Sequence, residues 1–166
     1  MAGLRASVAA GDANVWNDDC VDLFLAPGGR SSEYYQFAFA AGGGIFSAYY
    51  EEAGFIQPDA YMPVIESAIF KGKDFWSIEI KLPLRAFYMT PASRWNEKWL
   101  VNVGRGRYRK DWEHASWSKV ERGFRDSSKF RNMAGFPQKP ADQDGAITAV
   151  LFNGKEKSGD GCRGVL

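Results

Sequence analysis

Residues 15–29 read VWNDDCVDLFLAPGG, and this stretch decides the predicted fold. Apolar side chains alternate with others over 20–26, which is the pattern of a β-strand with one buried face. Val21, Leu23 and Leu25 share that face, and an aromatic and acidic segment stands directly before the strand. The Pro-Gly-Gly that follows is typical of a turn. The sequence therefore predicts a strand over 20–26 with polar and aromatic groups at its start.

The same alternation returns along the chain, with short turns between the segments. The glycines at 42–44 and the segment 71–74 are typical of hairpin turns. Residues 51–61 are predicted to form a loop, and residues 83–87 one helical turn. The predicted strands span 20–26, 34–40, 45–50, 62–70, 75–82, 99–107, 115–120 and 130–133. This pattern predicts an all-β fold, an antiparallel two-sheet β-sandwich that is jelly-roll-like.

Composition limits the classes of partner. The chain has 166 residues of which 45% are hydrophobic, enough for the core of one domain. Its net charge of +1 provides no general attraction to nucleic acid or to an anionic membrane. No apolar run is long enough to span a membrane, and no segment reads as a signal peptide. Cys20 and Cys162 are predicted to be free thiols, and a single histidine offers no zinc site.

The segment before the first predicted strand suggests a binding chemistry. Trp16 is followed closely by Asp18, Asp19 and Asp22. An aromatic face can stack on the C–H face of a sugar ring, and carboxylates accept hydrogen bonds from hydroxyl groups. The alternative is a capping loop in which Trp16 is packed and the acids are solvated. These residues alone leave both interpretations open.

Five segments in order resemble carbohydrate-binding module family 9. They are WNDDCVDLFL at 16–25, YYQFAF at 34–39, FWSIEIKLPL at 75–84, WLVNVGRGR at 99–107, and a closing pair, SWS at 116–118 with GFRDSSKF at 123–130. The similarity covers roughly residues 12–135. Because folds are shared more widely than ligands, the resemblance is more specific for the sandwich than for a particular sugar.

In this family a terminal sugar lies in a slot between two aromatic rings. The resemblance implies that Trp16 and Phe124 are these rings, with Phe124 standing where sugar-binding members carry Trp. It also implies that Asp22 takes the place of a slot glutamate. An arginine and a glutamine of the slot correspond to Ala38 and Gly104 here. Two hydrogen-bonding side chains are therefore missing from these positions.

Other residues are candidates for the rim of the same site. Tyr108 and Trp112 lie in the polar loop after the predicted strand 99–107 and are predicted to contact carbohydrate. Arg105 could bind an acidic sugar or sulfate, and the alternative is an ion pair with Asp18, Asp19 or Asp111. Asp18 and Asp19 are also the candidates for a structural calcium ion, because oxygen ligands suit Ca²⁺ and relatives in the family carry such ions. No other cofactor is expected.

The resemblance also suggests how the chain is divided. Residues 1–137 are predicted to be a family-9-like module that lacks its N-terminal strands, since the family normally has further strands before Trp16. Residues 138–166 are predicted to be a linker and the start of a following module, because 146–152 reads as a new strand.

Catalytic motifs are absent from the sequence, which contains no paired catalytic carboxylates, nucleophile elbow or phosphate loop. We therefore expect a non-catalytic carbohydrate-binding module of a larger exported glycan-processing protein, whose parent could be a glycoside hydrolase. Its expected partners are an oligo- or polysaccharide and neighbouring modules, in a secreted or periplasmic setting. One alternative is a spacer sandwich without ligand. Another is a heme- or redox-binding sandwich, for which His114, Met62, Met89 and Met133 are weak ligand candidates.

Overall fold

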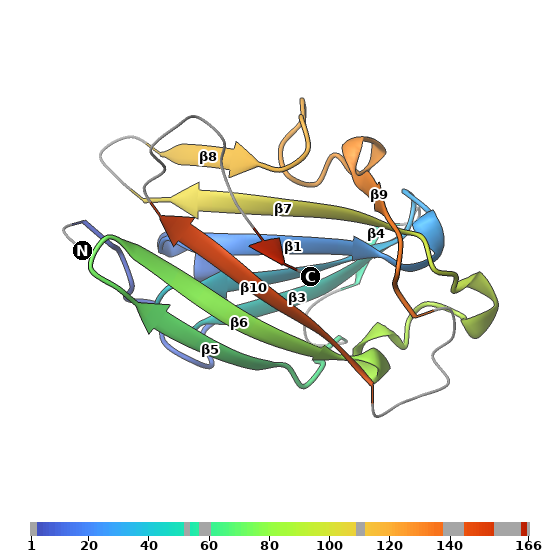
Figure 1. Ribbon diagram of the computed structural model, residues 1–166, viewed down its shortest axis with the longest axis horizontal. Coiled ribbons are helices and arrows are strands. Elements are labelled where there is room, and N and C mark those ends of the chain that lie inside the picture. The colour runs from blue at the N-terminus through green and yellow to red at the C-terminus, as the bar shows by residue number, and fades with distance from the viewer. Residues whose placement is uncertain are drawn as a thin grey trace.

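The computed structural model describes residues 3–51, 54–56, 61–108, 112–137, 145–154 and 164–165. Two antiparallel sheets pack face to face, with the four-stranded sheet in front of the seven-stranded sheet in Figure 1. We call them the small sheet and the large sheet. The predicted antiparallel β-sandwich is confirmed.

The large sheet has the strand order β4-β3-β2-β1-β7-β8, and β9 also pairs with β7. Its strands are β1 (Cys20–Ala26), β2 (Tyr34–Ala40), β3 (Ile45–Glu51), β4 (Gly54–Ile56), β7 (Trp99–Arg107), β8 (Glu113–Ser116) and β9 (Arg131–Met133). The small sheet has the order β11-β10-β6-β5. Its strands are β5 (Glu66–Lys71), β6 (Phe75–Pro83), β10 (Ala146–Gly154) and β11 (Gly164–Val165).

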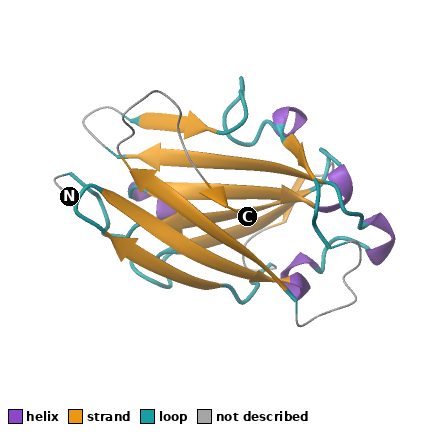
Figure 2. Cartoon of the chain, in the orientation of Figure 1, coloured by secondary structure: helices purple, strands orange, loops and turns teal. Residues whose placement is uncertain are grey.

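The helical segments are short 3-10 turns, most of them at one end of the strands in Figure 2. They are η1 (Val15–Asn17), η2 (Pro27–Gly29), η4 (Leu84–Phe87), η5 (Ala92–Arg94) and η6 (Ser127–Lys129). The predicted helical turn over 83–87 corresponds to η4. In the described ranges no helix has the length and apolar character needed to cross a membrane.

The core between the sheets follows the alternation of the sequence. Val21, Leu23 and Leu25 of β1 face this core, as predicted. The small sheet adds four large side chains from β6, namely Trp76, Ile78, Ile80 and Leu82. Full burial of each such side chain contributes about 1.5–3 kcal/mol, so these two strands fix how the sheets stack.

Three predicted boundaries are wrong in detail. The strand predicted over 62–70 begins only at Glu66, after a proline that has no N–H for a strand ladder. The strand predicted over 115–120 is β8, which ends at Ser116 because the N–H of Ser118 bonds a side chain, that of Asn102. The predicted loop 51–61 contains β4, which pairs with the end of β3. Residues 57–60 of that loop lie outside the described residues.

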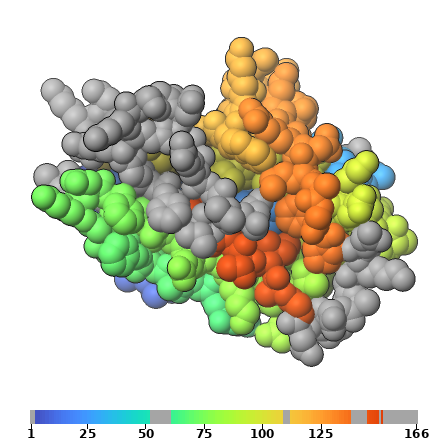
Figure 3. All heavy atoms as spheres, in the orientation of Figure 1, coloured from blue at the N-terminus to red at the C-terminus, as the bar shows by residue number. Residues whose placement is uncertain are grey.

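The strand predicted at 146–152 belongs to this sandwich. As β10 it pairs with β6 along all nine of its residues, and its Ile147 and Leu151 pack into the shared core. Figure 3 shows β10 in the middle of one face, between the green and orange parts of the chain. Its assignment to a following module is therefore wrong. The reason is long-range pairing, which the sequence around 146–152 does not reveal.

Strand β1 is buried on both faces, although only one face meets the core. Cys20, Asp22 and Phe24 point to the outer face of the large sheet, and none is more than 1% exposed. Rings from loops and neighbouring strands cover this outer face. A charged side chain is thus held under aromatic rings, an arrangement that is costly without compensating contacts.

Candidate functional site

Asp22 lies at the centre of the outer face with a small residue on each side. It is in register with Ala38 of β2 and with Gly104 of β7. Neither neighbour has a side chain beyond Cβ, so the space above the sheet on both sides of the carboxylate is left for groups from other segments.

Two rings occupy that space, and they are the two rings named from the sequence. Trp16 in η1 packs against Phe46, with ring centroids 4.7 Å apart, and remains 41% exposed. Phe46 is in register with Ala38, on one side of Asp22. On the other side the Phe124 ring lies on Gly104, where an added Cβ would be 2.6 Å from Phe124 Cδ2. The structure thus brings Trp16, Asp22 and Phe124 together.

The Asp22 carboxylate is not fully satisfied by the protein. Its Oδ1 accepts a hydrogen bond of 2.6 Å from Gln36 Nε2. Its Oδ2 is buried and has no partner at hydrogen-bond distance and angle among the described residues. Burial raises the pKa of Asp22 to about 6, although hydrogen bonding from Gln36 and a longer, poorly aligned approach of the Trp16 indole N–H oppose the rise, as does the charge of Arg125. Oδ2 therefore keeps the capacity to accept a well-aligned hydrogen bond from a ligand, beside the Trp16 indole.

A chain of hydrogen bonds leads from Asp22 to the rim of the site. Beyond Gln36, the Tyr50 hydroxyl donates to Gln36 Oε1 at 2.9 Å, and Arg125 Nη1 donates to the Tyr50 hydroxyl oxygen at 3.3 Å. The Arg125 guanidinium also lies 5.6 Å from the centre of the Tyr50 ring. Sequence analysis missed these three residues. Strand parity could have found Gln36 and Tyr50, since they share the outer face with Asp22.

Two of these residues supply the side-chain types that are missing at Ala38 and Gly104. An arginine and a glutamine do reach the site, but Arg125 comes from the loop after β8 and Gln36 from β2. Side chains from different positions thus supply a guanidinium and an amide near one carboxylate. The comparison of single positions along a sequence cannot detect such a change, because the contacts cross between strands.

Tyr108 and Trp112 lie on the same outer face, beside the site rather than within it. Trp112 packs edge to face with Tyr108 at 4.7 Å, and the His114 ring lies 5.5 Å from Trp112. The His114 ring is in turn 5.4 Å from Phe124. Trp112 also lies over Gly106, 3.8 Å from where a Cβ would stand. Their predicted contact with carbohydrate stays a prediction.

Arg105 does not join the site. It alternates with Gly104 and Gly106 on β7, so its side chain leaves the opposite face of the sheet from Asp22. There it forms an ion pair with Glu113 of β8. The predicted place of Arg105 at the rim of this site is therefore wrong. The alternative, an ion pair, is what the structure shows, but among the described residues its acid is Glu113 rather than Asp18 or Asp19. Asp111 lies outside the described residues.

Asp18 and Asp19 connect separate segments of the chain through hydrogen bonds. Although burial opposes ionisation of Asp18, hydrogen bonds from the Val8 N–H at 2.6 Å and the Ser7 hydroxyl at 2.7 Å keep its pKa below the ordinary value. Asp19 Oδ1 accepts from the Tyr108 N–H at 2.6 Å. Protein donors thus occupy both acids. Within the described ranges, no cluster of three or more acidic, histidine or cysteine side chains is arranged to hold a metal ion.

The residues named for a heme or redox group are dispersed. His114 lies on the outer face beside Trp112, while Met89 and Met133 pack against the core between the sheets. Met62 is exposed before β5. The structure does not place any of these methionines beside His114. Cys20 is a free buried thiol, and Cys162 lies outside the described residues.

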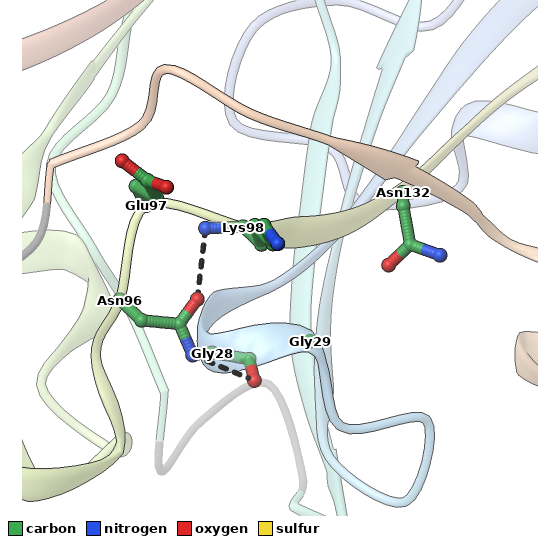
Figure 4. Close-up of a pocket in the computed structure, with 6 residues that line it drawn as sticks. All are labelled: Gly28, Gly29, Asn96, Glu97, Lys98 and Asn132. Atoms are coloured by element: carbon green, nitrogen blue, oxygen red, sulfur yellow. Dashed lines mark hydrogen bonds between the residues drawn. The ribbon is translucent and has the colours of Figure 1, made fainter.

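A shallow pocket of about 380 Å³ lies where η2 meets the segment before β7 (Figure 4). Asn96 organises it, donating from Nδ2 to the Gly28 carbonyl and accepting from the Lys98 N–H. Its lining consists of Gly28, Gly29, Asn96, Glu97, Lys98 and Asn132. No aromatic ring lines it, and its polar side chains are already exposed to water. A ligand in this pocket would meet only solvated polar groups, whereas a ligand at Asp22 would meet a buried carboxylate.

The contact between Gly104 and Phe124 gives a first prediction. Gly104→Val should push the Phe124 ring off the sheet and lower the free energy of unfolding by about 1–3 kcal/mol, because an overpacked site must rearrange. Urea denaturation measures this loss. In a Phe124→Ala background the same substitution should cost much less, since the ring it strikes is gone. An equal cost in both backgrounds would show that Phe124 does not rest on Gly104.

Comparisons with known proteins support the fold. No protein-family model matches this chain, and no curated protein is detectably similar to it in sequence. Among solved structures, a candidate carbohydrate-binding protein from Bacteroides uniformis ATCC 8492 matches with a TM-score of 0.65 and 20% identity. The match covers 81% of this chain and 68% of that chain. The likeness shows the fold. Because one fold hosts many ligands, the likeness does not identify a ligand for this chain.

Proposed function

We propose that this domain is a non-catalytic carbohydrate-binding module that holds a sugar between Trp16 and Phe124, above Asp22. The observation that carries the proposal is the buried Asp22 Oδ2, which accepts no well-aligned hydrogen bond from the described residues and lies between the Trp16 and Phe124 rings. The fold likeness to a candidate carbohydrate-binding protein supports it.

Each group has a defined part in this proposal. The Trp16 and Phe124 rings stack on the C–H faces of the sugar, and Asp22 Oδ2 accepts from a hydroxyl group. Arg125 donates to a sugar oxygen while it stays close to Tyr50. These contacts orient a neutral, polyhydroxylated ring, and none of them supplies the second carboxylate that glycoside hydrolysis requires.

The site must open to admit the sugar. Asp22 is only 1% exposed, so its Oδ2 becomes accessible when the Phe124 ring or the Trp16 ring moves aside. The segment that carries Phe124 is the easier to move, because residues 121–123 before it are exposed. The Asn102 side chain holds it by a hydrogen bond of 3.2 Å to the Phe124 carbonyl. The wider setting, an exported protein with several modules, is part of the proposal and rests on the family resemblance.

Trp16→Ala tests the stacking role. With a glycan array to find the sugar and calorimetry to measure it, we expect wild-type binding in the micromolar to millimolar range, about −8 to −4 kcal/mol. Trp16→Ala should weaken it at least tenfold and leave the melting curve cooperative, because the ring is 41% exposed. Phe124→Trp should tighten binding by offering a larger ring.

The matched control is Phe70→Ala, which removes a ring that is 59% exposed on β5 of the small sheet. It should leave affinity unchanged. If Trp16→Ala unfolds the protein, Trp16 is a core residue. If wild-type protein binds no sugar at millimolar concentration, the sandwich is a spacer.

A further inference from the structure

Residues 118–129, between β8 and β9, lie over the outer-face site as a separate unit, which we call the cover loop. In Figure 1 this loop rises beyond β8 and carries η6. It is closed on itself, since the Asp126 carboxylate accepts from the Ser128 hydroxyl at 2.7 Å and from the Glu121 N–H at 3.5 Å. Glu121 and Lys129 also form an ion pair of 3.6 Å. These contacts do not involve the sheet, so the loop is able to move as one body.

Both ends of the cover loop are fixed to the sandwich. Just before it, the Trp117 N–H donates to the Val103 carbonyl at 2.9 Å. Just after it, Phe130 is buried, with its ring 5.4 Å from the ring of Phe24. Hinged segments have this construction, in which a few terminal residues absorb the motion of the body between them. Movement of the cover loop would therefore leave the two sheets intact.

One buried side chain fastens the cover loop to the sheet. Asn102 of β7 is fully buried, and its Oδ1 accepts from the Ser118 N–H at 3.0 Å. Its Nδ2 donates to the Phe124 carbonyl at 3.2 Å. Farther out, Arg125 donates to the Tyr50 hydroxyl oxygen at 3.3 Å. Hydrogen bonds of this kind contribute little net free energy, because water replaces them when the loop lifts.

The closed loop leaves two buried polar atoms without a well-aligned hydrogen bond from the part of the chain that the structure describes. They are Asp22 Oδ2 beneath the Phe124 ring and Ser118 Oγ at the base of the loop. Lifting the loop would admit water to both atoms. For Asp22 the benefit depends on charge, because an ionised carboxylate loses far more hydration on burial than a neutral acid does.

We propose that the cover loop is a lid gated by the charge of Asp22, closed when this carboxyl is protonated and opening when it is ionised. The lid would control access to the proposed site, and it does not require that the ligand be a sugar. Burial in the closed state raises the pKa of Asp22 to about 6 from 3.8, so closing takes up a proton. The closed state is therefore favoured most well below pH 4. It loses this advantage as pH rises to about 6, by up to about 100-fold in the ratio of open to closed lid.

Neighbouring charges do not supply the same signal. Burial raises the pKa of the Cys20 thiol on β1 and of the Tyr34 hydroxyl on β2 to about 12, so both are neutral in this range. The hydrogen bond to Tyr50 raises the pKa of Arg125, which stays cationic. Within the loop, the hydrogen bond from Ser128 lowers the pKa of Asp126, which stays ionised above about pH 4.

His114 of β8 requires a control of its own. Its ring lies 5.4 Å from the Phe124 ring, and imidazole side chains change charge between about pH 5 and 8. The other elements around Asp22 contribute polar side chains or glycine, namely Trp16 of η1, Gln36 of β2, Tyr50 of β3, and Asn102 and Gly104 of β7.

Hydrogen exchange followed by NMR on the whole chain, without ligand, tests the lid. The observed exchange rate of an amide divided by its intrinsic rate at the same pH gives the opening constant of that amide. The opening constant of the Ser118 N–H, which bonds Asn102 in the closed state, should rise at least about tenfold from about pH 4.5 to about pH 7.5. The Trp117 N–H, one residue earlier and bonded to the Val103 carbonyl, should show no such rise.

Three variants identify the group that drives the change. Asp22→Asn should keep the opening constant of Ser118 at its low-pH value throughout, because no charge develops under the loop. His114→Gln should retain the wild-type rise. Asp74→Asn, which changes an exposed acid far along the chain in the turn between β5 and β6, should also behave as wild type.

Each outcome decides the proposal. An opening constant of Ser118 that is the same at both pH values overturns the lid. So does an equal rise at Trp117, because the edge of the large sheet would then loosen as a whole. A rise that persists in Asp22→Asn and disappears in His114→Gln assigns the trigger to His114 and overturns the role of Asp22. Since no sugar is present, failure of the lid leaves the carbohydrate slot standing, and failure to bind sugar leaves the lid standing.

Discussion

Ile147→Asp is expected to unfold the domain, whereas Thr148→Asp, one residue along β10, is expected to leave it folded. Ile147 is buried in the core shared by the two sheets, and Thr148 is exposed. Loss of a large core side chain costs about 2–5 kcal/mol. An unpaired carboxylate in the same place adds a desolvation cost of several kcal/mol. Together these approach the roughly 5–15 kcal/mol that holds a typical domain folded.

Thr148→Asp is a matched control because it introduces the same charge into the same strand. Thr148 is in register with Lys81 of β6, so an aspartate there meets an opposite charge in water. Circular dichroism with thermal or urea denaturation distinguishes the two variants. If Ile147→Asp melts like the wild-type protein, β10 does not belong to this core, and a module boundary near residue 138 becomes correct after all.

Asp22→Asn is expected to stabilise the protein at neutral pH and to weaken carbohydrate binding. Burial raises the folded-state pKa of Asp22 to about 6 from an ordinary value of 3.8. Well below pH 4 the carboxyl is neutral in both states, so it costs nothing. As pH rises from about 4 to 6, the unfolded chain ionises first and stability falls. Above about pH 6 the cost is constant, up to about 3 kcal/mol.

The asparagine variant removes this titration and keeps an amide oxygen that can accept from Gln36. Its gain in unfolding free energy over wild type should therefore be small at pH 4, grow up to about pH 6, and then level off. Urea denaturation across this pH range measures the gain. Asp74→Asn, which changes an exposed acid in the turn between β5 and β6, should show no such rise.

Binding should change in the opposite direction. The buried carboxylate is a stronger acceptor than an amide, so Asp22→Asn should weaken carbohydrate binding while it strengthens the fold. Such an exchange of stability for function is expected where a domain keeps an unpaired buried charge for a ligand. If Asp22→Asn instead destabilises the protein at pH 7, the carboxylate serves the fold, and its unpartnered oxygen is not a ligand site.

Local features of the sequence were enough to predict the strands that carry the site. The alternation in β1, β2, β6 and β7 and the hairpin turns at 42–44 and 71–74 each depend on a few neighbouring residues. The family resemblance then placed Trp16, Asp22 and Phe124 at one site, and the structure brings them together.

What the sequence did not determine were the partners of elements and side chains. The alternation at 146–152 predicts a strand, but only the burial of Ile147 and Leu151 assigns it to the small sheet. The polar chain through Gln36 and Tyr50 to Arg125 likewise depends on which strands lie side by side.

Arg105 shows the physical reason most clearly. Its charge and its glycine neighbours suggest a ligand site, but the side-chain period of a strand turns it to the other face, where it meets Glu113. Secondary structure follows from residues close in sequence. The side chains that share a site are decided by register between strands, and register is fixed by burial over the whole sandwich.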